Sequence, residues 1–260
     1  MKRLLVVLFL LVASAAAQVD SSAQEIIFDA LNKARVAHGL KPLTLDTKLT
    51  DVAQQHSALM AKQHAISHQF YQEPGPTERI VGTGLRMEAT GENVAVSKTA
   101  ERAHKALMNS PPHRANILNR RFNAVGIGVI RDRDALYVTE DFARTVPTYT
   151  VEQAERRVAD FVAQLRRSAR SPELKLITNP QLRKLACDMA QADFLSMSNI
   201  RTLPGVSTTV VFTTADLSGV PHALAPLKTA PGTSMSVGVC YRATATHVIP
   251  EYWVAVVTYF

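Results

Sequence analysis

Two short stretches decide the fold of this chain: Gly91-Glu92-Asn93-Val94-Ala95 and, further along, Ser110-Pro111-Pro112-His113-Arg114-Ala115-Asn116-Ile117-Leu118. Proline lacks a backbone N–H and clashes with the preceding helical turn, so the double proline predicts the end of a helix over residues 98–108. The break places His113 at the start of a new turn, where a rigid backbone presents its imidazole. Pro-Pro-His also occurs in ordinary loops, so the prediction of a site depends on the surrounding sequence.

Residues 23–144 have a helix-then-hairpin pattern. Apolar residues at helical spacing predict the helices, with Gly39 ending the first and Asp46 capping the second. Asp132-Arg133-Asp134 predicts the hairpin turn. The expected elements are helices at 24–38 and 48–63, a long glycine- and proline-rich loop at 73–91, and hairpin strands at 124–131 and 135–142.

The second half, residues 152–260, repeats this order more weakly, after a linker at 145–151. Val237-Gly238-Val239-Cys240 resembles Ile127-Gly128-Val129-Ile130, and Leu182 resembles Leu49. We favour a degenerate duplication, although two unrelated helix-then-hairpin domains could also give this pattern. The second half lacks the Gly-Glu-Asn and Pro-His-Arg segments, so a shared fold would have lost the site. Its expected elements are helices at 152–167 and 181–195 and a last strand at 253–260.

The N-terminus predicts export. Lys2 and Arg3 precede an apolar run, and Ala15-Ala16-Ala17 supplies small residues for cleavage, so residues 1–17 are expected to be a signal peptide. A retained membrane anchor is the alternative. No later segment reaches eighteen apolar residues, so an integral membrane protein is not expected. The predicted location is outside the cell or in the periplasm.

Charge and cysteine content narrow the function classes. Removing Lys2 and Arg3 lowers the formal charge from +7 to +5, and the remaining basic residues are dispersed, so nucleic acid is not an expected partner. Cys187 and Cys240 are the only thiols, and export makes a disulfide between them plausible, although sequence alone leaves pairing open. Neither cysteine lies near a candidate base, which argues against a catalytic thiol.

Four side chains of the first half are candidates for chemistry: His68, Glu73, Glu92 and His113. Two imidazoles and one or two carboxylates suit Zn²⁺ or another divalent cation. The same set could form an acid–base pair in which a carboxylate tunes a histidine. No two of them form a local pair such as His-x-x-x-His, so spacing alone also fits scattered surface groups.

A family resemblance joins these residues. The first half resembles the CAP superfamily (cysteine-rich secretory proteins, antigen 5 and pathogenesis-related proteins), in the bacterial extracellular SCP-domain form. The matching elements run in the family's order over most of the first half. They are Asn32-x-x-Arg35, Leu49 with Ala53, His56 and Ser57, Ser67-His68, Gly91-Glu92-Asn93-Val94-Ala95, Met108-Asn109-Ser110, His113-Arg114-Ala115-Asn116-Ile117-Leu118, and Val125-Gly126-Ile127-Gly128.

The resemblance implies an α+β fold, an α-β-α sandwich with a small antiparallel sheet. A degenerate α+β domain with a similar helix-then-hairpin order is expected to follow. The resemblance also implies a cleft that carries His68, Glu92 and His113 as binding residues and metal ligands, with Glu73 at a second acidic position. In some relatives the cleft binds zinc or another divalent cation, and in others the fold binds sterols or fatty acids. No general reaction is established for the family.

Several residues depart from the family or are set aside. Glu140 stands where glutamine is common; it could add charge near the cleft or face solvent, and we expect it to face solvent. His56 is expected to be packed or capping, and His64 to lie outside the metal site. Asn93 and Asn116 are expected to hold turns through backbone hydrogen bonds.

Three functions follow, in order of preference. The first is a binding module whose cleft holds a divalent cation or a small ligand such as a lipid, without turnover. The second is an interaction protein with a vestigial cleft that recognises a cell-envelope component. The third is a metal-assisted hydrolase in which Glu92 or Glu73 activates water.

Overall fold

The computed structural model describes residues 17–260, so the predicted signal peptide falls almost entirely outside the described residues. Over the described part of the chain, no helix has the length and apolar character needed to cross a bilayer. The strands form two separate sheets, one from each half of the sequence.

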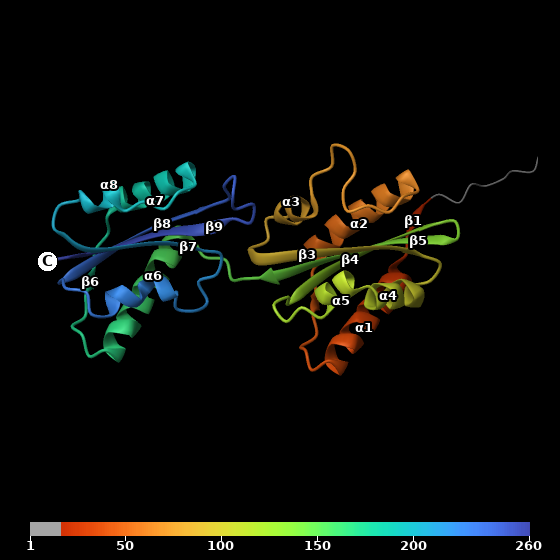
Figure 1. Cartoon of the computed structure of the whole chain (residues 1–260), viewed down its shortest axis with the longest axis horizontal. Helices are drawn as coiled ribbons and strands as arrows, with labels where there is room; N and C mark the ends of the chain where they lie inside the picture. Colours follow the sequence, from red (N-terminus) through yellow and green to blue (C-terminus); the bar gives the residue numbers. More distant parts are fainter. Residues whose placement is uncertain (1–16) are drawn as a thin grey trace, which may run out of the picture. The chain divides into compact units, whose positions relative to one another are not determined.

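The first half builds a five-stranded sheet with helices on both faces. Its path is β1-β4-β5-β3, and β2 pairs with β4. Helices α1, α4 and α5 cover one face and α2 covers the other (Figure 1). The elements are β1 (Gln18–Val19), α1 (Ser21–Ala37), β2 (Thr44–Leu45), α2 (Thr47–Gln63), α3 (Pro76–Val81), β3 (Met87–Ser97), α4 (Ala100–Asn109), α5 (Pro111–Ile117), β4 (Ala124–Asp132) and β5 (Ala135–Thr145).

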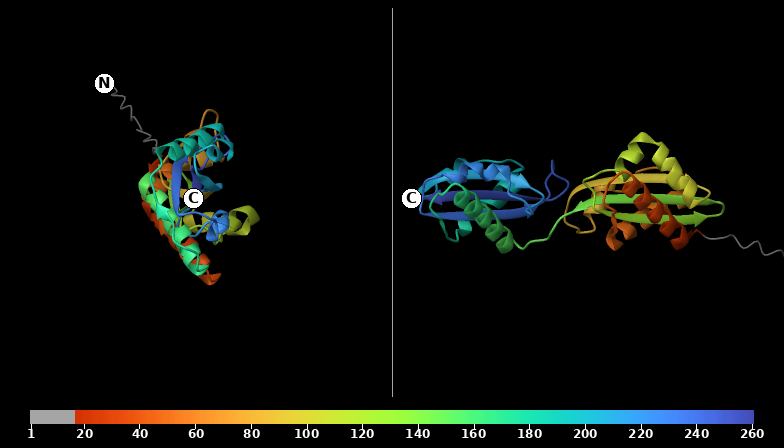
Figure 2. Two further views of the ribbon diagram at one scale, coloured as in Figure 1. Left: turned by 90° about the vertical axis from the view of Figure 1, so that its left-hand side faces the viewer. Right: turned by 90° about the horizontal axis from the view of Figure 1, so that it is seen from below.

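The second half builds a four-stranded sheet, β6-β8-β9-β7, again between helices. Helix α6 and the 3₁₀ helix η1 lie on one face, and α7 and α8 lie on the other (Figure 1). Seen from below, α1 and α6 each lie across the strands of their own sheet (Figure 2). The elements are α6 (Val151–Ser168), β6 (Lys175–Leu176), α7 (Pro180–Ala192), α8 (Ser198–Arg201), β7 (Val206–Thr214), η1 (His222–Lys228), β8 (Ser234–Arg242) and β9 (Glu251–Tyr259).

The predicted α+β sandwich is therefore confirmed, and the burial of the strands gives its physical reason. Successive side chains of a strand point to opposite faces. The first seven residues of β4 and the middle seven of β9 are all buried, so both faces of each strand must be covered. Helices on both sides provide that cover.

Glycines in β4 allow α2 to approach the sheet. A Cβ at Gly126 would lie 2.0 Å from the Leu49 carbonyl carbon, and one at Gly128 would lie 2.2 Å from that of Ala53. The two glycines are two residues apart and so share one face of the strand, while Leu49 and Ala53 share one face of the helix. The backbone of the helix therefore lies directly on the strand.

The same contact recurs in the second half, but with a different register from the one the sequence suggested. A Cβ at Gly238 in β8 would lie 2.5 Å from the Leu182 carbonyl carbon in α7. The approach of Gly238 to Leu182 matches that of Gly126 to Leu49, whereas the sequence similarity had paired Gly238 with Gly128, two residues further along. A shift of two keeps each side chain on the same face, so the hydrophobic pattern could not reveal it.

A buried arginine lies in the last turn of the first helix of each half. Arg35 donates from Nε to Lys41 O and from Nη1 to Ile117 O. Arg166 donates from Nε to Pro172 O, again six residues ahead, and from Nη1 to Leu227 O and Ala230 O. Each guanidinium thus joins the segment just after its own helix to a segment far along the chain, a role that its fork of donors makes possible.

The second helix of each half ends in a left-handed residue that pairs with a residue beyond a later strand. His64 caps α2 with φ 49°, and its Nδ1 lies 3.2 Å from Asp132 Oδ2. Asp193 caps α7 with φ 52°, and its Oδ1 lies 3.2 Å from His247 Nδ1. The acid and the base are exchanged between the halves. In both, the pair ties the helix end to the sheet.

A disulfide joins Cys187 in α7 to Cys240 in β8, with 5.0 Å between the Cα atoms. Sequence had left this pairing open. The bridge fastens α7 to the sheet on which it packs.

The prediction of a long loop over residues 73–91 is wrong in part. It contains α3, which begins at Pro76 after the N-cap Gly75, and the first residues of β3. Gly91, Glu92 and Asn93 therefore lie within a strand and do not form a turn. As the last strand on the sheet path, β3 tolerates the glycine and half-buried polar residues that obscured its pattern.

Candidate functional site

The structure brings together three of the four predicted site residues. His68 follows α2, Glu92 lies in β3, and His113 lies in the first turn of α5. His68 Nδ1 lies 2.7 Å from Glu92 Oε1, and the His68 and His113 rings are 6.4 Å apart between centroids, tilted by 38°. Residues 24 and 45 positions apart from His68 thus meet at one place.

The His68–Glu92 pair joins an exposed ring to a buried acid. The side chain of His68 is 52% exposed, whereas that of Glu92 is 2% exposed. An ionised carboxylate only accepts hydrogen bonds, so Nδ1 of a neutral His68 carries the proton and Nε2 carries the lone pair. Glu92 therefore fixes the tautomer of His68.

His113 is biased toward its neutral form. Partial burial, followed by the charge of His68, lowers the pKa of the His113 imidazole below its ordinary value. A neutral imidazole has a lone pair available to a metal ion or a proton. The His113 ring is thus suited to act as an electron-pair donor.

His56 anchors the segment that carries His68. It is buried in α2, and its Nε2 donates to the backbone oxygen of Ser67, 2.8 Å away. The prediction that His56 is a packed or capping residue is therefore confirmed.

Two asparagines hold the backbone of the other two site residues. Asn93 donates from Nδ2 to His113 O at 3.1 Å, and Asn116 donates from Nδ2 to Glu92 O at 3.1 Å. Asn116 Nδ2 also donates to Asn93 Oδ1 at 2.9 Å, which joins the two amides. The backbone hydrogen bonds expected of both asparagines are present, but they join strand β3 to helix α5 and do not hold turns.

Glu140 is the residue that the sequence analysis placed wrongly. It is 0% exposed in β5, and its Oε2 accepts a hydrogen bond from Asn93 Nδ2 at 2.9 Å. Its other oxygen, Oε1, is buried without a hydrogen-bond partner in the structure. Burial raises the pKa of Glu140 to about 7, against the smaller opposing effect of the Asn93 hydrogen bond.

Glu140→Gln is expected to remove a pH dependence of stability. The folded-state pKa of about 7 lies above the ordinary value of 4.5, so the folded state favours the protonated acid. That stability is fully present below pH 4.5 and is lost as pH rises through 7, by about 3 kcal/mol at completion. Urea unfolding of both proteins from about pH 4 to 8 measures it: the variant should gain relative to wild type as pH rises. A constant difference would contradict the burial of an ionisable group at this position.

Glu73 and His64 are fixed by other contacts. Glu73 Oε2 accepts from the Phe70 backbone at 2.9 Å, and its Oε1 lies 3.4 Å from Arg79 Nη1. His64 pairs with Asp132, as described above. The contacts found for Glu73 are thus those of a short loop and its neighbouring helix.

The residue types at the site suit a divalent metal ion, but the side chains are not arranged around a common centre. Two imidazoles and a carboxylate are ligands that Zn²⁺ accepts. Among residues 17–260, however, no three His, Cys, Asp or Glu side chains already stand as a metal-binding group. With Glu92 bonded to His68 Nδ1, the arrangement resembles the one in which a carboxylate orients a metal-binding histidine.

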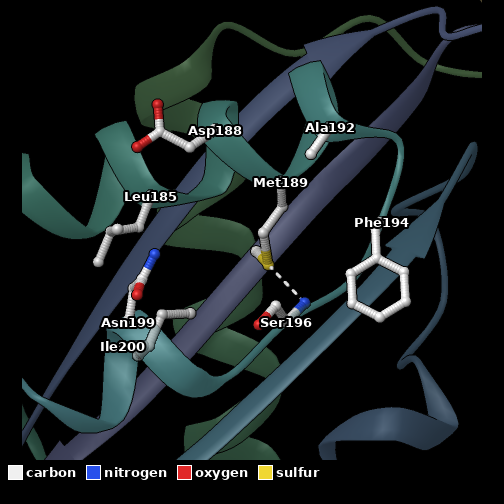
Figure 3. A pocket seen from close by; sticks show the side chains of 8 residues that line it. All are labelled: Leu185, Asp188, Met189, Ala192, Phe194, Ser196, Asn199 and Ile200. Atoms are coloured by element: carbon white, nitrogen blue, oxygen red, sulfur yellow. Dashed lines mark hydrogen bonds between the residues drawn. The ribbon is translucent and has the colours of Figure 1, made fainter.

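The second half has a pocket beside α7 and α8. Met189 Sδ accepts a hydrogen bond from the Ser196 backbone at 3.4 Å (Figure 3). The pocket has a volume of about 260 Å³ and is lined by Leu185, Asp188, Met189, Ala192, Phe194, Ser196, Asn199 and Ile200. The Phe194 ring lies at its edge, beside the Met189–Ser196 hydrogen bond (Figure 3).

Comparison with known proteins finds relatives of the first half. The sequence model of the cysteine-rich secretory protein family, CAP, matches residues 28–142. The uncharacterized protein YkwD of Bacillus subtilis is 34% identical over 111 residues, which cover 42% of this chain and 43% of that protein. The chain spans less than half the length of the curated relatives it matches.

Two solved structures are similar to part of this chain. An extracellular SCP-domain protein from Bacillus anthracis is 29% identical with a TM-score of 0.45, over 48% of this chain and 41% of that chain. An outer surface protein from Borrelia burgdorferi is 20% identical with a TM-score of 0.46, over 49% of this chain and 96% of that chain. The match of residues 28–142 to the family model therefore identifies a CAP domain in the first half of the chain.

Proposed function

We propose that this chain is an exported CAP-domain protein whose first half binds a divalent cation, with Zn²⁺ the best match, and does so without turnover. The observation that supports it is the His68–Glu92 hydrogen bond of 2.7 Å beside the His113 ring. A buried carboxylate that orients an exposed imidazole is a common support for a metal-binding histidine.

The three residues would have two different roles. His68, through Nε2, and His113 would supply the nitrogen ligands, and Glu92 would hold the His68 ring in orientation. This departs from the sequence-based expectation of Glu92 as a direct ligand, because its Oε1 is engaged with His68 Nδ1. A bound ion would act as a Lewis acid that also accepts oxygen ligands from water or a small molecule.

Export is proposed from the sequence of residues 1–17 and from the disulfide. Disulfides persist in oxidising compartments and are rare in the cytosol. The Cys187–Cys240 bridge therefore fits a protein that leaves the cytosol.

We propose in addition that the second half is a degenerate copy of the first. Three correspondences support this: Arg166 with Arg35, Gly238 with Gly126, and the Asp193–His247 pair with the His64–Asp132 pair. All three maintain the sandwich. The His68, Glu92 and His113 site has no counterpart in the aligned sequence of the second half.

Calorimetric titration of Zn²⁺ into the chelator-treated protein tests the proposed function. Wild type should bind one ion with a dissociation constant on the order of 1 μM or lower, and His68→Ala/His113→Ala should lose this binding. His64→Ala is the matched control, since His64 pairs with Asp132 elsewhere, and it should bind as wild type. Absence of binding by folded wild type would reject the metal site and favour a lipid or an envelope component.

A further inference from the structure

Glu140 is a fully buried acid that accepts a hydrogen bond from Asn93, the residue next to Glu92. We propose that it is a positioning residue for the His68–Glu92–His113 site: its carboxyl orients the Asn93 amide, which in turn fixes the backbone at Glu92 in β3 and at His113 in α5. This inference rests on the proposed function where the test measures zinc binding, whereas the magnetic resonance signals of Asn116 test it without a metal.

The first step is the hydrogen bonding of Asn93. A side-chain amide has two N–H donors and one oxygen acceptor. Both donors of Asn93 are used, one by Glu140 Oε2 at 2.9 Å and one by His113 O at 3.1 Å, and its oxygen accepts from Asn116. The Glu140 oxygen accepts but cannot donate on this side when ionised. It therefore selects the orientation in which the amide nitrogen faces both it and His113.

The second step passes from Asn93 to Asn116. With the Asn93 nitrogen facing Glu140, its oxygen faces Asn116 and receives a hydrogen bond of 2.9 Å. The Asn116 nitrogen then also donates to Glu92 O at 3.1 Å. The carboxyl on β5 thus acts together with His113 O, which also only accepts, to support hydrogen bonds to the backbone of Glu92 in β3 and of His113 in α5.

The third step is the energetic cost of this acid. Glu140 Oε1 is buried without a partner, and a buried polar atom left unpaired costs about 1–3 kcal/mol. An apolar residue of similar size would remove this unpaired oxygen and would lose one hydrogen bond from Asn93, so the two effects offset each other. A residue present for stability alone would not need a carboxyl here. The carboxyl is best explained by the orientation it imposes on Asn93.

The test compares Glu140→Leu with Glu140→Gln in the full chain, at about pH 8, where the wild-type acid is ionised. Glu140→Gln keeps an oxygen acceptor for Asn93 and should bind Zn²⁺ within about threefold of wild type. Glu140→Leu removes the acceptor and should bind about 10–100-fold more weakly, the effect typical of lost support for a metal ligand. Urea unfolding should show Glu140→Leu to be as stable as wild type or more so. Equal zinc affinity in Glu140→Leu and wild type would overturn the proposal.

A nuclear magnetic resonance measurement separates this inference from the metal site itself. The side-chain amide signals of Asn116, one hydrogen bond beyond Asn93, should shift in Glu140→Leu and stay in place in Glu140→Gln. If wild type binds no zinc, the proposed function fails, but these signals still decide the role of Glu140. Unmoved Asn116 signals in Glu140→Leu would refute it.

A second variant covers the case in which Glu140→Leu does not fold. Asn116→Ala breaks the same chain at its half-buried end and leaves the Glu140–Asn93 hydrogen bond intact. It should weaken zinc binding about tenfold or more. Undiminished affinity would show that the amide chain does not position the site.

Discussion

Gly126→Ala is expected to disrupt the first half of the protein. The added Cβ would lie 2.0 Å from Leu49 C, 2.2 Å from Thr50 N and 2.4 Å from Leu49 O, all of them backbone atoms that no side-chain rotation can move. Strand β4 and helix α2 would have to separate, and overpacking of this kind costs about 3 kcal/mol or more. The free energy of unfolding, measured by circular dichroism in urea, should fall by at least this amount.

Gly219→Ala is the matched control for this prediction. A Cβ at Gly219 meets no atom within 4 Å, so this variant should stay within about 0.5 kcal/mol of wild type. If Gly126→Ala were as stable as Gly219→Ala, the close approach of α2 to β4 would be incorrect.

Cys187→Ala/Cys240→Ala is expected to lose most of the stability of the second half. The bridge spans 53 residues, and the chain-entropy model assigns about 4 kcal/mol to a loop of this size. Trp253, the only tryptophan, is buried and pairs with Cys240 across β8 and β9. Its fluorescence therefore reports unfolding of this sheet directly.

Two comparisons make the disulfide prediction specific. Reduced wild type should unfold at the same urea concentration as the double variant, because both lack the covalent bridge. Zinc binding by the first half should be unchanged in either. A tryptophan transition that is unaltered by reduction would show that the bridge adds no stability.

Much of the fold could be predicted from the sequence because its signals are local. Helical spacing of apolar residues identified α1 and α2, and the double proline at Pro111 and Pro112 separates α4 from α5. Strand β3 escaped prediction because its polar, glycine-containing start suits the last strand of a sheet path as well as a loop.

The residues that support the site were harder to predict than the site itself. His68, Glu92 and His113 were found through a resemblance that fixes their order in the chain. Glu140 was expected in solvent because Thr139-Glu140-Asp141 is polar and lies in a strand. Its partner, Asn93, is 47 residues away, and only the helices covering both faces of the sheet bury the pair. No local pattern carries that information.

The amide chain of Asn93 and Asn116 has a consequence for behaviour in concentrated salt. Dissolved ions screen exposed charges over about 8 Å at physiological strength, and over less as the salt rises. Surface pairs such as Arg183 with Glu152 weaken accordingly. The hydrogen bonds that hold the Glu92 and His113 backbones join uncharged amides to uncharged carbonyls, and the carboxyl of Glu140 that bonds to Asn93 is fully buried, so dissolved ions do not reach it. The arrangement of β3 and α5 at the site should therefore be the same in concentrated salt as in dilute buffer.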